Sequence, residues 1–145
     1  MESNQSNIKS SKIKIDFKDS KYATGRRKTS IAKVWLKKGT GKIYVNGKIY
    51  SDYFANENHK MQIVKPFELI KQPTEYDVRC SVKGGGPTGQ AGAMVHGISK
   101  ALVMFDENLK STLKTEKLTT RDSRAVERKK PGRKKARRSF QFSKR

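Results

Sequence analysis

The last twenty-five residues, 121–145, constrain the fold most because their charge opposes compaction. They contain twelve Lys or Arg but only Asp122 and Glu127 as acids, a local net charge of +10 within a chain total of +21. Apolar side chains are few in this segment, and its like charges repel one another. We therefore expect an extended basic tail over residues 121–145, ordered only against a polyanion. Nucleic acid is the first partner to consider.

The rest of the 145-residue chain is long enough for one domain with a modest core. Residues 1–20 lack the apolar stretch of a secretory signal and the acid-free face of a transit peptide, so a disordered polar extension is expected there. Residues 21–120 then form the globular domain. No apolar run reaches the length of a membrane-spanning helix, and we expect no membrane partner. Cys80 is the only cysteine, which excludes an internal disulfide framework and fits a reducing compartment.

Alternating apolar positions predict strands in the first half of the chain. Ala32, Val34 and Leu36 share one face within the segment 21–38, which predicts one strand there. Residues 42–45 and 48–50 flank the pair Asn46-Gly47, which is typical of a tight hairpin turn. Antiparallel pairing should therefore dominate this half.

The second half mixes helical and strand spacing. Residues 59–72 have helical spacing interrupted by Pro66 and closed by Pro73, which predicts a helix with an irregular middle. Residues 76–83 alternate as a strand, and Pro87 can open the helix that follows. A shorter helix should begin at Asp106. The apolar stripe expected on the long helix is Ala91, Val95, Ile98, Leu102 and Phe105, and the small residues that would let it approach the sheet closely are Gly92, Ala93, Gly97 and Ala101.

The glycine-rich segment 84–89 fits G-x-G-x-x-G between a predicted strand and a predicted helix, the context of a dinucleotide fingerprint. However, no second strand of a parallel βαβ unit is predicted after the helix. Gln90 and Ala91 also occupy positions where a P-loop needs Lys and Ser or Thr. We favour a backbone role, in which the glycines permit close approach and leave N–H groups at the helix start for an RNA phosphate. A nucleotide-dependent enzyme is the weaker interpretation of this loop.

The residue pattern gives little support for a catalytic site or a metal site. His59 and His96 have no Cys or carboxylate at metal-ligand spacing, so a structural or polar surface role is expected for both. Cys80 falls on the buried face of its predicted strand, with no acid and base around it. We expect no enzyme activity, no cofactor and no metal.

Three adjacent cations, Arg26, Arg27 and Lys28, stand at the entrance of the first strand. Such a run is often only a solvated face. Beside the basic tail, a phosphate-binding role is more persuasive, because forked guanidinium groups make two-point contacts with phosphate oxygens.

Eight motifs, in order over residues 21–145, resemble the S-nine family of small-subunit ribosomal proteins, in its bacterial or organellar branch. They are Thr24-Gly25-Arg26-Arg27-Lys28, Gly41-Lys42-Ile43, Val82-Lys83-Gly84-Gly85-Gly86, Gly89-Gln90-Ala91-Gly92-Ala93, His96-Gly97-Ile98, Thr120-Arg121-Asp122-Ser123-Arg124, Val126-Glu127-Arg128-Lys129-Lys130 and Gln141-Phe142-Ser143-Lys144-Arg145. Two positions depart from the family pattern. Val95 stands where many members carry a basic residue, and Pro87 replaces a residue that is more often aliphatic.

The resemblance implies an α/β (α+β) fold: a two-layer sheet-and-helix domain like the second domain of the S-five ribosomal protein, with a left-handed βαβ crossover and a long basic C-terminal tail. The residue pattern alone would not predict that hand. It further implies a structural constituent of the small-subunit head, in contact with rRNA and neighbouring head proteins. The tail would run toward peptidyl-site tRNA. The ribosome could belong to a bacterial cytoplasm, a mitochondrion or a plastid.

Together, the residue chemistry and the resemblance predict the following sites. The rRNA-binding residues expected in the body are Arg26, Arg27, Lys28, Lys83, Gly84, Gly85 and Gln90, and those expected in the tail are Arg121, Arg124, Arg128, Lys129, Lys130, Arg133, Lys134, Lys135, Arg137 and Arg138. The tRNA-binding residues implied by the resemblance are Ser143, Lys144 and Arg145. The alternative is a non-ribosomal compaction protein that coats DNA through the same charge.

Overall fold

The computed structural model describes residues 18–71 and 75–144, so most of the predicted extension 1–20 lies outside the described residues. The strands are β1 (Lys21–Arg27), β2 (Ser30–Lys38), β3 (Ile43–Val45), β4 (Lys48–Ile49) and β5 (Tyr76–Lys83). The helices are α1 (Tyr50–Tyr53), α2 (Glu57–Leu69), α3 (Pro87–Phe105) and α4 (Leu109–Thr115). Within the described ranges, no helix combines the length and the apolar character needed to cross a membrane.

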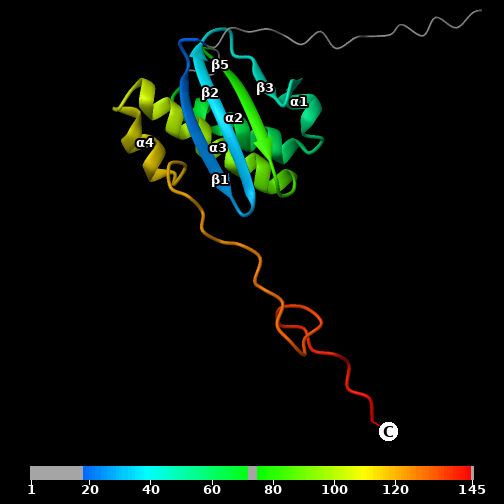
Figure 1. The fold of residues 1–145 in the computed structure, drawn as a ribbon. Helices are drawn as coiled ribbons and strands as arrows, with labels where there is room; N and C mark the ends of the chain where they lie inside the picture. Colours follow the sequence, from blue (N-terminus) through cyan, green and yellow to red (C-terminus); the bar gives the residue numbers. More distant parts are fainter. Residues whose placement is uncertain (1–17, 72–74, 145) are drawn as a thin grey trace, which may run out of the picture.

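The strands form one five-stranded sheet in the order β1-β2-β5-β3-β4. Neighbouring strands are antiparallel except β3 and β5, which are parallel and are joined through α1 and α2 as a βαβ unit. The two long helices, α2 and α3, lie on the same side of the sheet (Figure 1). This mixed sheet with helices on one face confirms the prediction of an α+β fold.

The strands β2 and β5 bury alternate side chains against α3, as their sequence patterns predict. Ala32, Val34 and Leu36 are fully buried from β2, and β5 contributes Val78 and Cys80 to the same layer. Burial raises the pKa of the Cys80 thiol to about 12, so at neutral pH the side chain is an uncharged core group. Its predicted structural role is confirmed.

The strand β1 corrects the prediction of a single strand over 21–38. Residues 21–27 form a separate strand that pairs with β2 through a two-residue turn at Lys28 and Thr29. Its buried face carries only Ala23 and Gly25 before Arg27. The apolar alternation that marks a strand is therefore missing, because this face is reserved for small residues.

Those small residues allow α3 to lie directly on β1. A Cβ atom on Gly25 would overlap backbone atoms of Ala93 and Gly97, and one on Gly97 would lie 2.6 Å from a methyl group of Val34. The predicted close approach of helix and sheet is confirmed. Ala91, Ile98 and Leu102 of the predicted stripe are buried, whereas Val95 and Phe105 are only partly covered.

The remaining helices differ from expectation mainly at their boundaries. Helix α2 begins at Glu57, after an Asn56 cap whose side chain accepts a hydrogen bond from the Asn58 N–H, and it continues through the buried Pro66. Pro73, the predicted terminator, lies outside the described residues. Helix α4 starts later than the predicted Asp106, whose carboxylate accepts a hydrogen bond from the Asn108 N–H at 2.9 Å.

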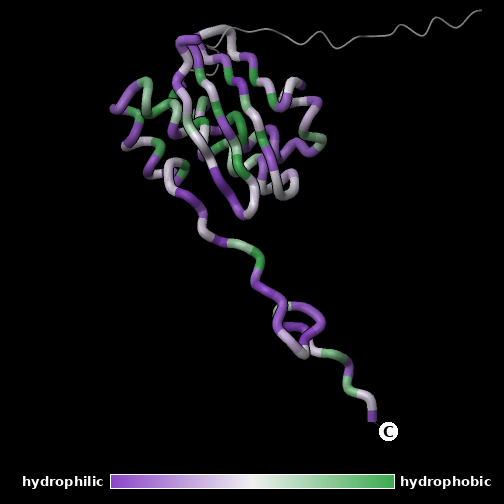
Figure 2. Tube along the Cα trace, in the orientation of Figure 1, coloured by the Kyte–Doolittle hydropathy of each residue, from purple (hydrophilic) through white to green (hydrophobic). Residues whose placement is uncertain are grey.

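From residue 121 to residue 144 the chain contains no helix or strand and runs away from the sheet and helices (Figure 1). Figure 2 shows this segment as mostly hydrophilic, with a few isolated hydrophobic positions. It is not extended throughout, because residues 127–138 curl into a loop. The Glu127 carboxylate pairs with Lys130 at 2.8 Å and Arg137 at 2.9 Å, and the Lys134 N–H donates to the Arg138 carbonyl at 2.7 Å.

The contact between α3 and β1 can be tested by adding one methyl group. We predict that Gly25→Ala lowers the free energy of unfolding by about 3 kcal/mol, because its neighbours are backbone atoms that cannot rotate away. Urea unfolding followed by circular dichroism measures this change. The control is Gly86→Ser, since Gly86 has extended dihedral angles, open space around its Cβ position and a helix N-cap location that favours Ser. Equal unfolding midpoints for the two variants would contradict the prediction.

Candidate nucleic-acid interface

Two segments far apart in sequence form one corner of the sheet: the β1–β2 turn and the glycine loop after β5. The Ser30 hydroxyl donates to the Gly84 carbonyl at 3.0 Å. Gly84 and Gly85 have φ values of +75° and +63°, a region that favours glycine, and a Cβ on Gly84 would lie 2.7 Å from the Thr29 carbonyl oxygen. The predicted backbone role of the glycines is therefore seen as close packing on the turn.

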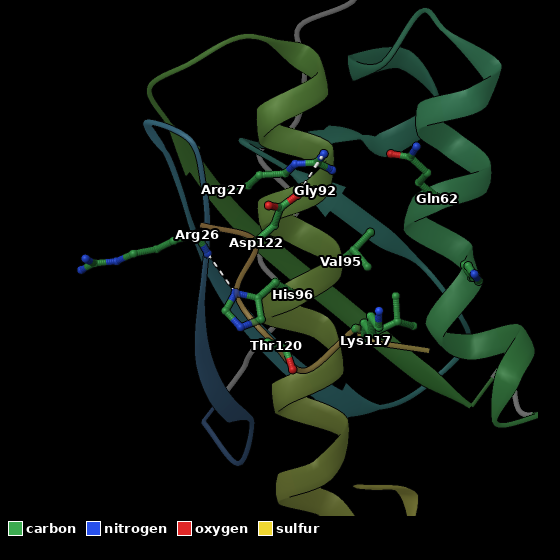
Figure 3. A pocket seen from close by; sticks show the side chains of 11 residues that line it. Arg26, Arg27, Gln62, Gly92, Val95, His96, Lys117, Thr120 and Asp122 are labelled. Carbon is green, nitrogen blue, oxygen red and sulfur yellow. Dashed lines mark hydrogen bonds and ion pairs between the residues drawn. The ribbon is translucent and has the colours of Figure 1, made fainter. Parts of the chain in front are cut away.

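The three adjacent cations Arg26, Arg27 and Lys28 lie in different places and do not share one direction. Arg26 projects away from α3, whereas Arg27 reaches over the helix beside Gly92 (Figure 3). Lys28 sits at the turn with a φ of +51° and is exposed. Lys83 ends β5 with its side chain exposed. These cations therefore surround the corner and do not form a single patch.

Asp122 connects the root of the basic tail to the body. Its carboxylate lies 3.4 Å from the Arg27 guanidinium and 2.8 Å from that of Arg124. The hydrogen bonds from Arg124, with the nearby Arg27 charge, hold the pKa of Asp122 well below its usual range. The sequence pattern predicted no structural role for Asp122, which counted only as an acid that lowers the net charge of the tail. Its position at the start of the tail, between Arg121 and Arg124, was the available signal.

Gln90, which is half-buried, forms hydrogen bonds within the protein through both ends of its amide. Its Nε2 donates to the Gly84 carbonyl at 3.2 Å, and its Oε1 accepts from the Tyr53 hydroxyl at 2.9 Å. It thereby fixes the glycine loop against α1. The start of α3 has Gly86 as its N-cap, with no side-chain cap and no acidic residue in the first turn. Its positive end is thus available to an anion.

A cavity of about 270 Å³ lies where β1, α2, α3 and the tail root meet. Figure 3 shows the residues that line it, with Val95 between Gln62 and His96. Val95 therefore lines a cavity bordered mainly by polar residues, at the position where a basic residue would be expected. The cations Lys65 and Lys117 also border it, and Lys65 pairs with Glu116 at 2.9 Å.

The predicted tail cations are all exposed, and several pair with each other's backbone or with the two acids. Arg133 donates to the Ser139 hydroxyl at 2.6 Å, while Arg128 contacts the Lys129 carbonyl at 3.3 Å. The exposed predicted residues of this segment are Arg121, Arg124, Arg128, Lys129, Lys130, Arg133, Lys134, Lys135, Arg137 and Arg138. The structure therefore places them in one solvent-facing segment, whose root is joined to Arg27 of the body through Asp122.

At the tip, Ser143 and Lys144 are exposed, and Arg145 lies outside the described residues. Phe140 and Phe142 are 64% and 86% exposed, so neither packs on the domain. Aromatic rings held in this way can stack on bases or fill an apolar groove in a neighbouring molecule.

The two histidines have local hydrogen-bonding roles. His59 Nε2 lies 3.2 Å from the Thr88 hydroxyl, and His96 Nδ1 accepts from the Arg26 N–H at 3.2 Å. No group of three or more metal-ligating side chains occurs among the described residues. After α3 the described chain continues into α4 and the tail without another strand, so the glycine loop lacks the parallel unit of a dinucleotide site.

The partly buried ring of His96 predicts a pH dependence of stability. Burial disfavours the charged ring and lowers the pKa of His96, and the nearby Lys100 charge lowers it further. The folded protein then binds the proton more weakly than the unfolded chain. The stabilisation is complete above the ordinary histidine pKa of about 6.5 and is lost as pH falls below it.

We expect the urea midpoint of the full chain to fall between about pH 7.5 and pH 5.5, and to fall less in His96→Gln. Unfolding at the two pH values measures both changes. The same decrease in the two proteins would exclude His96 as its origin.

Comparisons with known proteins show the family of this chain. The family described as "Ribosomal protein S9/S16" matches residues 25–145, which include the glycine loop and the whole tail. The chain is also 54% identical over 144 residues to the small ribosomal subunit protein uS9 of Rickettsia prowazekii (strain Madrid E), an alignment that covers 99% of this chain and 89% of that protein. The chain with this cationic corner and tail belongs to the S9/S16 family of ribosomal proteins.

Proposed function

We propose that the protein is a structural constituent of the small ribosomal subunit and that it binds small-subunit rRNA. Family membership over residues 25–145 is the observation that carries this proposal. The charge distribution supports it, because the exposed cations of the corner and tail offer phosphate contacts in two places.

The mechanism is electrostatic. The corner presents Arg26, Lys28 and Lys83 beside the uncapped start of α3, and the tail supplies a second set of exposed cations. Each Lys or Arg that contacts a phosphate releases condensed counterions, so affinity falls with salt. The body, residues 21–120, would dock on folded rRNA, and residues 121–145 would become ordered between RNA segments.

The family resemblance suggests the topology of the domain and its position within the small subunit. The domain would share its topology with the second domain of the S-five ribosomal protein, and the parallel β3–β5 pair provides the βαβ unit whose crossover would be left-handed. The body would lie in the subunit head beside other head proteins. The relative in Rickettsia prowazekii is bacterial. We accordingly place the protein on the ribosome of a bacterium or of an organelle.

The tail tip would support peptidyl-site tRNA. Ser143 and Lys144 are exposed at the far end of the tail, which leads away from the domain (Figure 1). A terminal Lys-Arg pair on such a tail can reach phosphates that the body cannot touch. Tip and body would therefore contact different RNA molecules.

Salt dependence tests the rRNA role. If about six phosphates are engaged, affinity for structured small-subunit rRNA should fall roughly a thousandfold between 50 and 200 mM salt. We expect Lys134→Gln with Lys135→Gln to reduce the salt slope by roughly 0.7 to 0.9 for each phosphate that the variant no longer binds. The control is Lys110→Gln with Lys114→Gln, which removes the same charge from the exposed side of α4. Equal slopes for both pairs would contradict a specific role for the tail.

The same measurement separates ribosomal binding from DNA compaction. A compaction protein would bind duplex DNA as tightly as structured rRNA of equal charge, because only the phosphates would matter. The ribosomal proposal predicts a preference for the rRNA fragment. It also predicts that the protein co-sediments with small subunits and leaves them at high salt.

Deletion of Lys144 and Arg145 tests the tip. Small-subunit assembly should remain nearly intact, because the deletion leaves the body and most tail cations in place. Affinity of the purified subunits for peptidyl-site tRNA should decrease, measured by filter binding. Subunits that carry Lys110→Gln with Lys114→Gln serve as the control for charge loss. Unchanged tRNA affinity after the deletion would refute this role of the tip.

A further inference from the structure

The face of the sheet opposite α2 and α3 is not covered by any described element. In Figure 1 the strands β1, β2 and β5 lie in front of the two long helices, with this face toward the viewer. Every second strand residue is buried on the helix side, and the intervening residues are exposed or half-exposed. We call this surface the open face. It is separate from the cavity and from the tail.

The strand register places one row of large side chains across all five strands of the open face. The paired positions run in the order Tyr22, Trp35, Arg79, Tyr44 and Ile49. The rings of Tyr22 and Trp35 lie 5.3 Å apart at 45°, and the Arg79 guanidinium carbon is 5.8 Å from the Trp35 ring centroid. Tyr22 is 44% exposed and Ile49 47%. The row is therefore a partly exposed aromatic platform, in which Trp35 is half-buried between Tyr22 and the Arg79 cation.

Charge on this face identifies the kind of partner. The strand residues directed to it include five cations: Arg26, Lys33, Lys37, Arg79 and Lys83. Its single strand acid is Asp77, whose Oδ1 accepts hydrogen bonds from the Thr40 and Lys42 N–H groups at 2.9 Å each. That carboxylate is therefore used in fixing the neighbouring loop. The open face is complementary to an anion.

Aromatic rings set among cations suit unpaired RNA. A duplex buries its base faces and offers mainly phosphates and hydroxyls, whereas a single strand can place each base on a ring and its phosphates on adjacent cations. Neighbouring strands are about 4.8 Å apart and successive rows about 6.7 Å apart, which brings Lys33 within one row of both Tyr22 and Trp35. A protein partner would need a surplus of acids to match the same surface.

We propose that the open face binds a single-stranded segment of RNA, with bases stacked on Tyr22 and Trp35 and phosphates held by Lys33 and Arg79. This inference rests on the proposed RNA-binding function and adds a second, stacking mode to it. The open face is continuous with the corner described above, because Arg26, Ile31 and Lys83 form its next-to-last paired row beside the β1–β2 turn. One RNA segment can thus pass from the glycine loop onto the sheet.

Tryptophan fluorescence can report on this surface without an added label, because Trp35 is the only tryptophan of the chain. With the full-length protein, saturating unpaired oligouridylate should quench Trp35 emission. A hairpin RNA of equal length and charge should bind through the tail and leave the emission largely unchanged. Binding itself is followed in parallel by the anisotropy of the labelled RNA. Saturable binding of oligouridylate without any change in Trp35 emission would overturn the proposal.

Matched variants test stacking and charge separately. Trp35→Leu should weaken oligouridylate binding about fivefold or more, because the variant cannot form one base–aromatic stack. The control is Met104→Leu, an exposed apolar position on α3 that is 53% accessible. Lys33→Gln should lower the salt slope for oligouridylate by roughly 0.7, and Lys110→Gln should not. Circular dichroism of each variant establishes that it is folded.

The possible results distinguish failure of the open-face proposal from failure of the proposed ribosomal function. If the full chain binds no RNA, the proposed ribosomal function fails. If it binds RNA but Trp35→Leu and Met104→Leu bind RNA equally tightly, RNA binding by the open face is excluded and the proposed ribosomal function is not. Reduced affinity confined to Trp35→Leu and Lys33→Gln would support the assignment.

Discussion

The backbone contact between α3 and β1 is the constraint on which the other features depend. Because Gly25 and Gly97 carry no side chains, the helix lies directly on the edge strand of the sheet. That approach brings His96 within hydrogen-bonding distance of the Arg26 N–H. It also lets the stem of Arg27 cross Gly92 to meet Asp122 at the tail root. The direction in which the cationic tail leaves the body therefore follows from a contact between two glycines.

Sequence patterns predicted those elements whose buried faces carry large apolar side chains. Strands β2 and β5 and helix α3 were found for this reason. Strand β1 was missed because Ala23 and Gly25 give no apolar signal. For the same reason, the separation of Arg26 from Arg27 onto different faces was not predicted. Neighbouring residues on a strand point to opposite faces, so recognition of β1 would have separated them. The Gln90 contacts and the cavity around Val95 depend on distant segments, which no local pattern contains.

The two acids of the tail hold its positive charges in place. Asp122 holds Arg27 and Arg124 together, and Glu127 closes the loop through Lys130 and Arg137. Exposed ion pairs of this kind are screened by solvent and contribute little to stability, so a phosphate can replace the carboxylate at little cost. The cations are thereby kept near one another without being committed to an internal partner. A tail with no acids would have to overcome more repulsion when its cations gather around RNA.

The open face and the tail would recognise RNA through interactions that respond differently to solvent. Phosphate contacts weaken as salt rises because the counterions they release are already abundant. Stacking on Tyr22 and Trp35 depends on ring overlap and apolar burial, which salt does not screen. The tail, which projects far from the domain, suits long-range capture of a polyanion. The rigid sheet suits discrimination between paired and unpaired segments once capture has occurred. Because both belong to one short chain, attraction by the tail would raise the local concentration of RNA at the sheet, and a modest stacking preference there would then be enough to fix the register of binding.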